Sequence, residues 1–235
     1  MKFKYVIGKK VDPYYNLAME ECLMNCVDEE NSIIFLWQND KTIVVGRNQN
    51  VDVECDKESF LHWGGIIARR RSGGGAVYHD LGNINYSILS MSSNRDKLLY
   101  QDLMLALMEE YHITAFYNGR NDILVNGKKI SGNAEYTVGS KVCQHGTILV
   151  HSDFAVMKSF LTPSLSKMER NHISSVESRV ANLCDIIDNV SVPSIMEKVI
   201  YLTNATEIKE TIDLEYLQRK IKFYSDITWV YGGGR

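Results

Sequence analysis

The chain contains 235 residues, of which 45% are hydrophobic and 23% charged, and these values suit one large globular domain or one domain with a small appendage. The net charge of −3 argues against nucleic-acid binding through bulk electrostatics. No apolar run approaches the roughly 20 residues that span a bilayer, and the apolar part of the N-terminus is too short for a signal peptide. Five cysteines form no CxxC pair, and their odd number would leave one unpaired in a disulfide framework. These features predict a reduced, soluble, cytoplasmic protein.

The first helical signal lies close to the N-terminus. Asp12 is a favourable N-cap and Pro13 suits the first helical position, so a helix is predicted over 13–27. Further helices are predicted over 97–111, 153–161, about 193–203 and about 213–224. Within the first helix, Leu17, Glu20, Met24 and Val27 recur at helical spacing.

Strand patterns crowd the first two thirds of the chain. Asn126–Gly127 is the strongest two-residue hairpin signal in the sequence, and it separates two of these strands. Strands and helices do not alternate regularly, and no linker or repeat divides the chain, so we predict an α+β fold with a mixed, largely antiparallel sheet. The predicted strands cover 33–38, 42–46, 65–70, 76–79, 85–90, 122–125, 128–131 and 142–151.

The run from Arg69 to Asp80 joins three arginines, three glycines and a strand that ends in His-Asp. Glycines allow a sharp turn and a close backbone approach, so that main-chain N–H groups can face an anion. Arginines beside such a loop offer fork-shaped donors for phosphate or carboxylate. A glycine turn between strands, with a solvated basic face, is the alternative interpretation of this run alone.

Together with motifs in a fixed order along the chain, this run resembles the signature of the lipoate–protein ligase family. The resemblance covers nearly the entire sequence and implies the biotin/lipoate ligase catalytic fold, which is related to class II aminoacyl-tRNA synthetases. It also implies one catalytic domain over 1–235 without the accessory C-terminal domain of about a hundred residues that long family members carry. The other motifs are Asp12–Glu21, Trp37–Asn39, Val45–Asn50, Asn121–Ile123, Gly127–Ala134, His145–Leu149 and Ser174–Leu183.

The resemblance implies an ATP-dependent enzyme. Such enzymes convert lipoate and ATP into lipoyl-adenylate and pyrophosphate, and then transfer the lipoyl group to one lysine of an acceptor protein. The implied acceptors are the lipoyl domains of 2-oxoacid dehydrogenase E2 subunits and the glycine-cleavage H protein. In two-part family members a separate small subunit supports adenylation, and we therefore expect this chain to transfer lipoate from lipoyl-adenylate but to activate it poorly alone. No membrane or nucleic-acid partner is expected.

Lys129 is the candidate catalytic residue that the resemblance implies, placed between the lipoate carboxylate and the ATP α-phosphate. Lys128 should face solvent, because strand residues alternate. Asn121 and Asp122 are candidate Mg²⁺ ligands, although an aspartate at a strand start is also a common turn former. The family's ATP-binding positions correspond to Arg70, Gly75, Ala76, Val77, Tyr78 and Lys129, and its lipoate-binding positions to Ser72, Gly74, His79, Trp37, Leu17, Ala134 and Lys129.

Several of these residues have plainer interpretations. Leu17, Trp37 and Ala134 are also typical core residues. We expect His79 and His145 to be packed, hydrogen-bonded side chains rather than zinc ligands, because no closed ligand set accompanies them. On a strand, Arg69 and Arg71 would point away from Arg70.

Two other functions remain open. Relatives on the same fold transfer octanoyl or lipoyl groups through a cysteine thioester without ATP, and Cys143 is the cysteine nearest to the candidate site in sequence. A lipoate-binding protein without turnover is the other alternative, although intact Arg70, Lys129 and Asp122 weigh against it. Biotin ligation is disfavoured because the loop is Ser-Gly-Gly-Gly-Ala, without the arginine that interrupts the glycines of biotin ligases.

Overall fold

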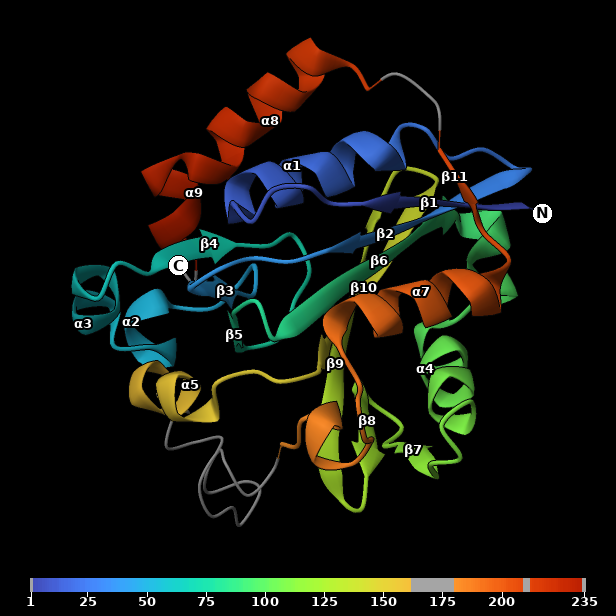
Figure 1. The fold of residues 1–235 in the computed structure, drawn as a ribbon. Coiled ribbons are helices and arrows are strands. Elements are labelled where there is room, and N and C mark those ends of the chain that lie inside the picture. The colour runs from blue at the N-terminus through green and yellow to red at the C-terminus, as the bar shows by residue number, and fades with distance from the viewer. Residues whose placement is uncertain (1, 162–179, 209–211, 234–235) are drawn as a thin grey trace.

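The computed structural model describes residues 2–161, 180–208 and 212–233. The first part of the Ser174–Leu183 motif, up to Arg179, lies outside these residues. The predicted α+β class is confirmed, since helices pack on both faces of a large mixed sheet (Figure 1).

The large sheet is mostly antiparallel. Among its described strands, β1 alone pairs with other strands in parallel, with β11 on one side and β2 on the other. A smaller sheet places β3 (Thr42–Val45) between β4 (Ile66–Arg69) and β5 (Ala76–His79). The eight strands of the large sheet are, in spatial order, β11 (Thr206–Glu207), β1 (Lys2–Ile7), β2 (Asn31–Trp37), β6 (Asn83–Met91), β10 (Lys141–Leu149), β9 (Lys128–Val138), β8 (Asp122–Val125) and β7 (Ala115–Tyr117).

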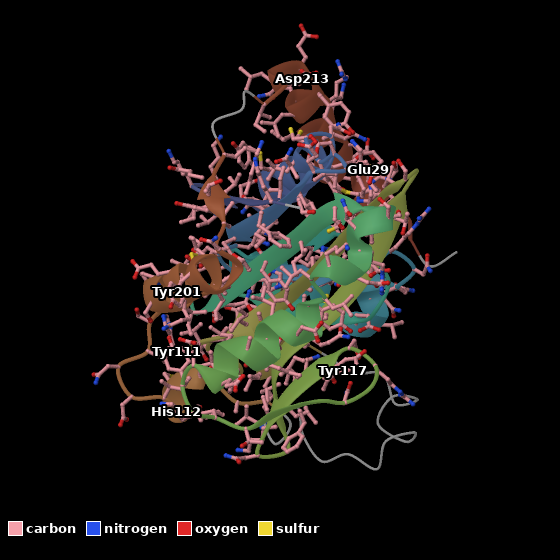
Figure 2. All side chains as sticks on the ribbon, turned by 90° about the vertical axis from the view of Figure 1, so that its right-hand side faces the viewer. Glu29, Tyr111, His112, Tyr117, Tyr201 and Asp213 are labelled. Atoms are coloured by element: carbon pink, nitrogen blue, oxygen red, sulfur yellow. The ribbon has the colours of Figure 1, made fainter. Side chains whose placement is uncertain are left out.

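Helices cover the two faces of the large sheet separately. On one side lie α1 (Pro13–Met24) and α8 (Leu214–Ser225), and on the other α4 (Tyr100–Glu109) and α7 (Val192–Thr203). Figure 2 shows α4 across the sheet, with Tyr111 and His112 at its end towards Tyr201 of α7, against which α4 packs. No helix among the described residues combines the length and apolar character that a membrane crossing requires. Around the small sheet lie α2 (Val51–Glu54), α3 (Lys57–His62), α5 (Phe154–Phe160) and α9 (Ile227–Tyr231).

The start of α1 is as predicted, and its end is earlier. The Asp12 side chain accepts the N–H of Tyr15 at 2.7 Å, and Pro13 occupies the first turn. The helix ends at Met24 rather than near Val27, because the chain turns through Asn25. Its buried side chains form one core cluster with those of β2, including Leu17 and Trp37.

The predicted helix over 97–111 is shorter in the structure. A 3₁₀ turn over Ser92–Lys97 precedes α4, and Leu98 and Leu99 between them are extended. The buried amide of Gln144 explains this break, because it donates to the carbonyls of Arg95 and Leu98 and accepts the N–H of Tyr100.

The predicted hairpin between β8 and β9 is confirmed. Asn126 and Gly127 have φ values of 50° and 75°, so both central residues of the turn are left-handed. This turn fixes the start of β9, and therefore the position of Lys129.

Replacing Leu107 of α4 by alanine should lower the free energy of unfolding by about 2–5 kcal/mol, because its fully buried side chain would leave a cavity. The same replacement at half-buried Leu105 should cost about 1 kcal/mol or less. Urea unfolding followed by circular dichroism measures both values. Equal losses of stability at the two positions would contradict the assignment of the Leu107 side of α4 as the side that packs against the sheet.

Candidate active site

Three of the predicted lipoate-binding residues, Leu17, Trp37 and Ala134, belong to the sheet face that α1 covers. Directly paired residues of antiparallel strands project from the same face. Trp37 of β2 pairs with Asn85 of β6, and Leu17 of α1 packs in the same core cluster as Trp37. A neighbouring cross-strand row runs through Phe35, Ser87, His145 and Ala134.

Lys129 extends along β9 towards this face. A Cβ atom added to Gly132 would lie 2.5 Å from the Lys129 Nζ atom, so the ammonium group covers the glycine. Gly132 precedes Ala134 by two residues and therefore shares its face, which places the Lys129 ammonium on the same face as His145. A side chain at position 132 would displace that ammonium group.

The Lys129 ammonium group is paired with Asp122, at 2.7 Å between Nζ and Oδ1. The second carboxylate oxygen of Asp122 accepts the Asn118 side-chain amide at 3.2 Å. Asn121 is exposed, and its carbonyl accepts two hydrogen bonds from Asn133. Lys128 is exposed as predicted. Of the two candidate Mg²⁺ ligands, Asp122 therefore contacts the candidate catalytic lysine, and Asn121 precedes Asp122 in the chain.

Arg70 shapes the glycine loop from inside. Its guanidinium donates to the carbonyls of Val44, Gly73 and Gly75 and to the Ser72 hydroxyl, at 2.8–3.0 Å. Burial without a contacting carboxylate lowers the Arg70 pKa to about 10. Most of its donors are therefore occupied by the loop.

The glycine loop itself presents unpaired backbone donors. Gly74 has φ of 92°, and a Cβ on Gly46 would lie 2.2 Å from the Gly74 carbonyl oxygen, so two backbones touch here. Among the described residues, none accepts a hydrogen bond from the N–H groups of Gly73, Gly74 or Gly75. Such a row of N–H groups is suited to an anion such as phosphate.

The other two arginines contact parts of the structure that Arg70 does not. β4 ends at Arg69, and Arg71 follows it. Arg69 is buried, and it donates to the carbonyls of Trp229 and Val230 and to three carbonyls after β3. Arg71 instead forms an ion pair with Glu21 of α1, with Nε and Oε2 2.9 Å apart.

A buried chain of polar groups crosses the site. The Ser72 Oγ atom lies 2.6 Å from Nε2 of His145, and Nδ1 of the same ring lies 2.9 Å from Oε2 of Glu20. All three residues are buried. Burial opposes ionisation of Glu20, but His145 and the hydroxyls of Ser87 and Tyr136 outweigh it, and the Glu20 pKa is lowered. Glu20 is thus an ionised carboxylate inside the protein.

Sequence reasoning did not find Glu20 as a site residue. The available signal was its position among Leu17, Met24 and Val27, since an acidic residue on the apolar side of a helix needs a buried partner.

His79 is the second buried histidine at the site. Its Nδ1 atom accepts from the Asn39 amide at 3.2 Å, which places the proton of the neutral ring on Nε2. Nε2 has no hydrogen-bond partner among the described residues. Burial, together with the charge of Arg70, lowers the His79 pKa to about 3. The ring is therefore a neutral donor pointing at no protein acceptor.

Comparison with known proteins identifies the family of this chain. The family described as "Lipoyl protein ligase A/B catalytic domain" matches residues 12–202. The chain belongs to this family. It is 37% identical over 221 residues to "Probable lipoate-protein ligase A" of Mycoplasma pneumoniae, covering 92% of this chain and 65% of the relative. It is 38% identical over 188 residues to lipoate-protein ligase A of Blochmanniella pennsylvanica, covering 78% and 56%. The chain therefore spans less than two thirds of these relatives.

Solved structures agree with the lipoyl protein ligase fold. Plasmodium falciparum LipL1, crystallised in complex with lipoate, has a TM-score of 0.78 and 27% identity, with 98% of this chain and 74% of that chain covered. The bi-partite lipoate protein ligase of Thermoplasma acidophilum has a TM-score of 0.80 at 24% identity, covering 98% and 96%. The second likeness supports the fold only.

Four of the five cysteines of this lipoyl protein ligase A/B member have raised thiol pKa values. Cys143 is fully buried, and burial with the nearby charge of Glu20 raises its pKa well above the usual range. Burial likewise raises the pKa of Cys22 to about 12 and that of Cys55 to about 11. Cys184 is exposed with a raised pKa, so thioester chemistry is disfavoured at these four positions.

Glu20, Cys143 and His145 place potential metal-ligand atoms within 4.8 Å of one another. However, both ring nitrogens of His145 already have hydrogen-bond partners, and the Cys143 thiol resists deprotonation. These contacts favour a hydrogen-bonded role for His145 over metal binding.

Lowering the pH should destabilise the protein through His79. Its pKa is about 3 when folded, against the usual 6.5, so the unfolded state binds the proton first. The contribution of the neutral His79 ring to the free energy of unfolding is fully present above about pH 6.5. As the pH falls towards 3, this contribution is lost at about 1.4 kcal/mol per pH unit. His79→Gln should therefore reduce the loss between pH 6.5 and 5 by about 1.5 kcal/mol in urea unfolding. Asn39→Ala keeps the ring and should keep the pH dependence, and an unaltered slope in His79→Gln would contradict this assignment.

Proposed function

We propose that the chain attaches lipoate to a lysine of an acceptor protein at the expense of ATP. The carboxylate of lipoate would displace pyrophosphate from ATP, and the acceptor amine would then displace AMP from lipoyl-adenylate. The observation that carries this proposal is the Lys129 ammonium group over Gly132, on the face shared by Ala134 and His145. The relatives named lipoate-protein ligase A and the lipoate complex of LipL1 point to the same chemistry.

The glycine loop is suited to hold the ATP phosphates. The N–H groups of Gly73–Gly75 would bind phosphate oxygens, and Arg70 would act by fixing the loop carbonyls so that these N–H groups face outward. β5 is an edge strand of the small sheet, and its Ala76 N–H donates to the Glu54 carboxylate at 3.1 Å, so the other outer backbone groups of Ala76–Tyr78 would hydrogen-bond the adenine base.

Lys129 would change partners when substrates bind. Its ammonium group leaves the Asp122 carboxylate and bridges the lipoate carboxylate and the α-phosphate, where it stabilises the negative oxygens of the transition state. Asp122, with Asn121 beside it, fits a Mg²⁺ ion that takes one or two protein oxygens and completes its shell with phosphate and water. The ion would supply charge neutralisation for the departing pyrophosphate.

Leu17, Trp37 and Ala134 would line an apolar slot for the aliphatic tail of lipoate, with Ser72, Gly74 and His79 at its polar margin.

The acceptors we propose are lipoyl domains of 2-oxoacid dehydrogenase E2 subunits and the H protein. In support, the Thermoplasma ligase was solved as part of a lipoylation system with its E2 lipoyl domain.

We propose a cytoplasmic location, and the five free cysteines are consistent with a reducing cytoplasm. We further propose that 1–235 acts as one catalytic domain, with adenylation assisted by a separate small subunit.

Intact mass of a purified lipoyl domain tests the proposal. One reaction contains the chain, ATP, Mg²⁺ and lipoate, and a second contains the chain with synthetic lipoyl-adenylate in place of ATP and lipoate. Product in both reactions identifies a self-sufficient ligase, and product only with the adenylate identifies a transfer enzyme that needs help with activation. Modification in neither reaction would refute the proposed function.

Lys129→Met should reduce lipoyl transfer from synthetic lipoyl-adenylate by roughly 10²–10³-fold, because one preorganised charge at the reacting oxygens is lost. Lys128→Met is the matched control, since this neighbouring lysine is exposed and should keep its rate within about threefold. The rates are measured by mass spectrometry of the lipoyl domain at equal enzyme concentrations. Equal rates for the two variants would remove Lys129 from the mechanism.

A further inference from the structure

The chain from Ser72 through His145 to Glu20 has the order of a proton relay. A hydroxyl, an imidazole and a carboxylate follow one another at 2.6 and 2.9 Å, within the range of direct hydrogen bonds. The same order of groups activates hydroxyls in unrelated enzymes. The proposed ligation of lipoate also requires a group that takes the proton lost by the acceptor amine.

The partners of these groups fix the direction of proton movement. Glu20 can only accept, so Nδ1 of His145 carries a hydrogen and Nε2 of the neutral ring accepts the Ser72 hydroxyl proton. Arg70 donates from Nε to the Ser72 oxygen at 3.0 Å, and this contact stabilises negative charge on the hydroxyl oxygen. Ser72 can therefore pass a proton to His145 while it takes one from a ligand.

The relay ends where the reaction would occur. His145 is the cross-strand partner of Ala134, on the face that also carries the Lys129 ammonium over Gly132. Gly132 and Ala134 are two residues apart on β9, a separation of about 7 Å along a strand. Ser72 is directly followed by exposed Gly73 and Gly74 of the candidate phosphate loop. The relay thus connects the loop to the face that would hold the acyl group.

We propose that Ser72 and His145 are the proton-accepting residues of the transfer step, with Glu20 as the residue that positions His145. This inference rests on the proposed lipoate ligation. As the acceptor lysine nitrogen bonds to the acyl carbon, the bond from that carbon to the AMP oxygen breaks and AMP leaves with the electron pair. The nitrogen loses a proton to the Ser72 oxygen, and the Ser72 proton passes to Nε2 of His145. Glu20 then balances the charge of the imidazolium.

Single-turnover transfer from synthetic lipoyl-adenylate to a lipoyl domain, followed in mixtures of H₂O and D₂O, tests the relay. Two protons that move together give a curved dependence of rate on the deuterium fraction. We expect this curvature for the wild-type protein, and a straight dependence for Ser72→Ala and His145→Gln. Their transfer rates should fall about 10²-fold or more, the usual contribution of a positioned base.

Glu20→Gln tests the positioning role, because it preserves the shape of the side chain but removes the charge that balances the imidazolium. It should lower the rate of lipoyl transfer by a larger factor than the rate of adenylate formation. Lys128→Met serves as the control here too, since this exposed lysine contacts no member of the relay. Its rate and its curved isotope dependence should follow those of the wild type.

A straight dependence in the wild-type protein would overturn the relay, and this measurement needs no variant to fold. Transfer by His145→Gln within about threefold of the wild-type rate would overturn it as well. Absence of any transfer by the wild-type protein is a different outcome. It would refute the proposed ligation itself, and the relay with it.

Discussion

Two neighbouring carboxylates on α1 hold the site together. Because consecutive helical residues point about 100° apart, Glu20 and Glu21 contact different parts of the structure. Glu20 accepts from β6, β9 and β10 through Ser87, Tyr136 and His145. Glu21 binds Arg71 after β4, together with Lys220, Tyr216 and Tyr224 of α8. The glycine loop between Arg71 and β5 is thereby fixed to the large sheet through α1.

Both carboxylates remain ionised although they are buried. For Glu21, burial opposes the charge, but hydrogen bonds from Lys220 and the charge of Arg71 prevail and the pKa is lowered. A buried ion pair contributes little net stability, yet removing one partner leaves an uncompensated charge and costs several kcal/mol. The arrangement therefore specifies one position of the loop more than it stabilises the fold. A loop that must present backbone N–H groups to phosphates benefits from such a fixed position.

Local signals in the sequence were sufficient for most elements. The Asp12–Pro13 cap predicted the start of α1, and Asn126–Gly127 predicted the β8–β9 turn, because each depends only on residues a few positions apart. The glycine run and Lys129 also stood out as candidates, and the structure brings them to one region. The partners of the arginines could not be predicted in this way. Arg69 binds carbonyls about 160 positions away, and Glu20 meets His145 across 125 positions. Such pairs depend on the topology of the sheets, and no spacing along the chain encodes them.

The contacts of Arg69 have a consequence for local unfolding. One guanidinium joins the carbonyls at Trp229 and Val230 in α9 to those of Gly46, Arg47 and Gln49 after β3. If α9 detached, the arginine would keep its charge and lose acceptors, so the segment after β3 would be destabilised at the same time. We therefore expect the last described helix and the backbone that touches the glycine loop at Gly46 to open together, so that amide hydrogens of both segments exchange with solvent through the same opening. Opening at the C-terminal end of the described chain would then disturb the proposed phosphate site.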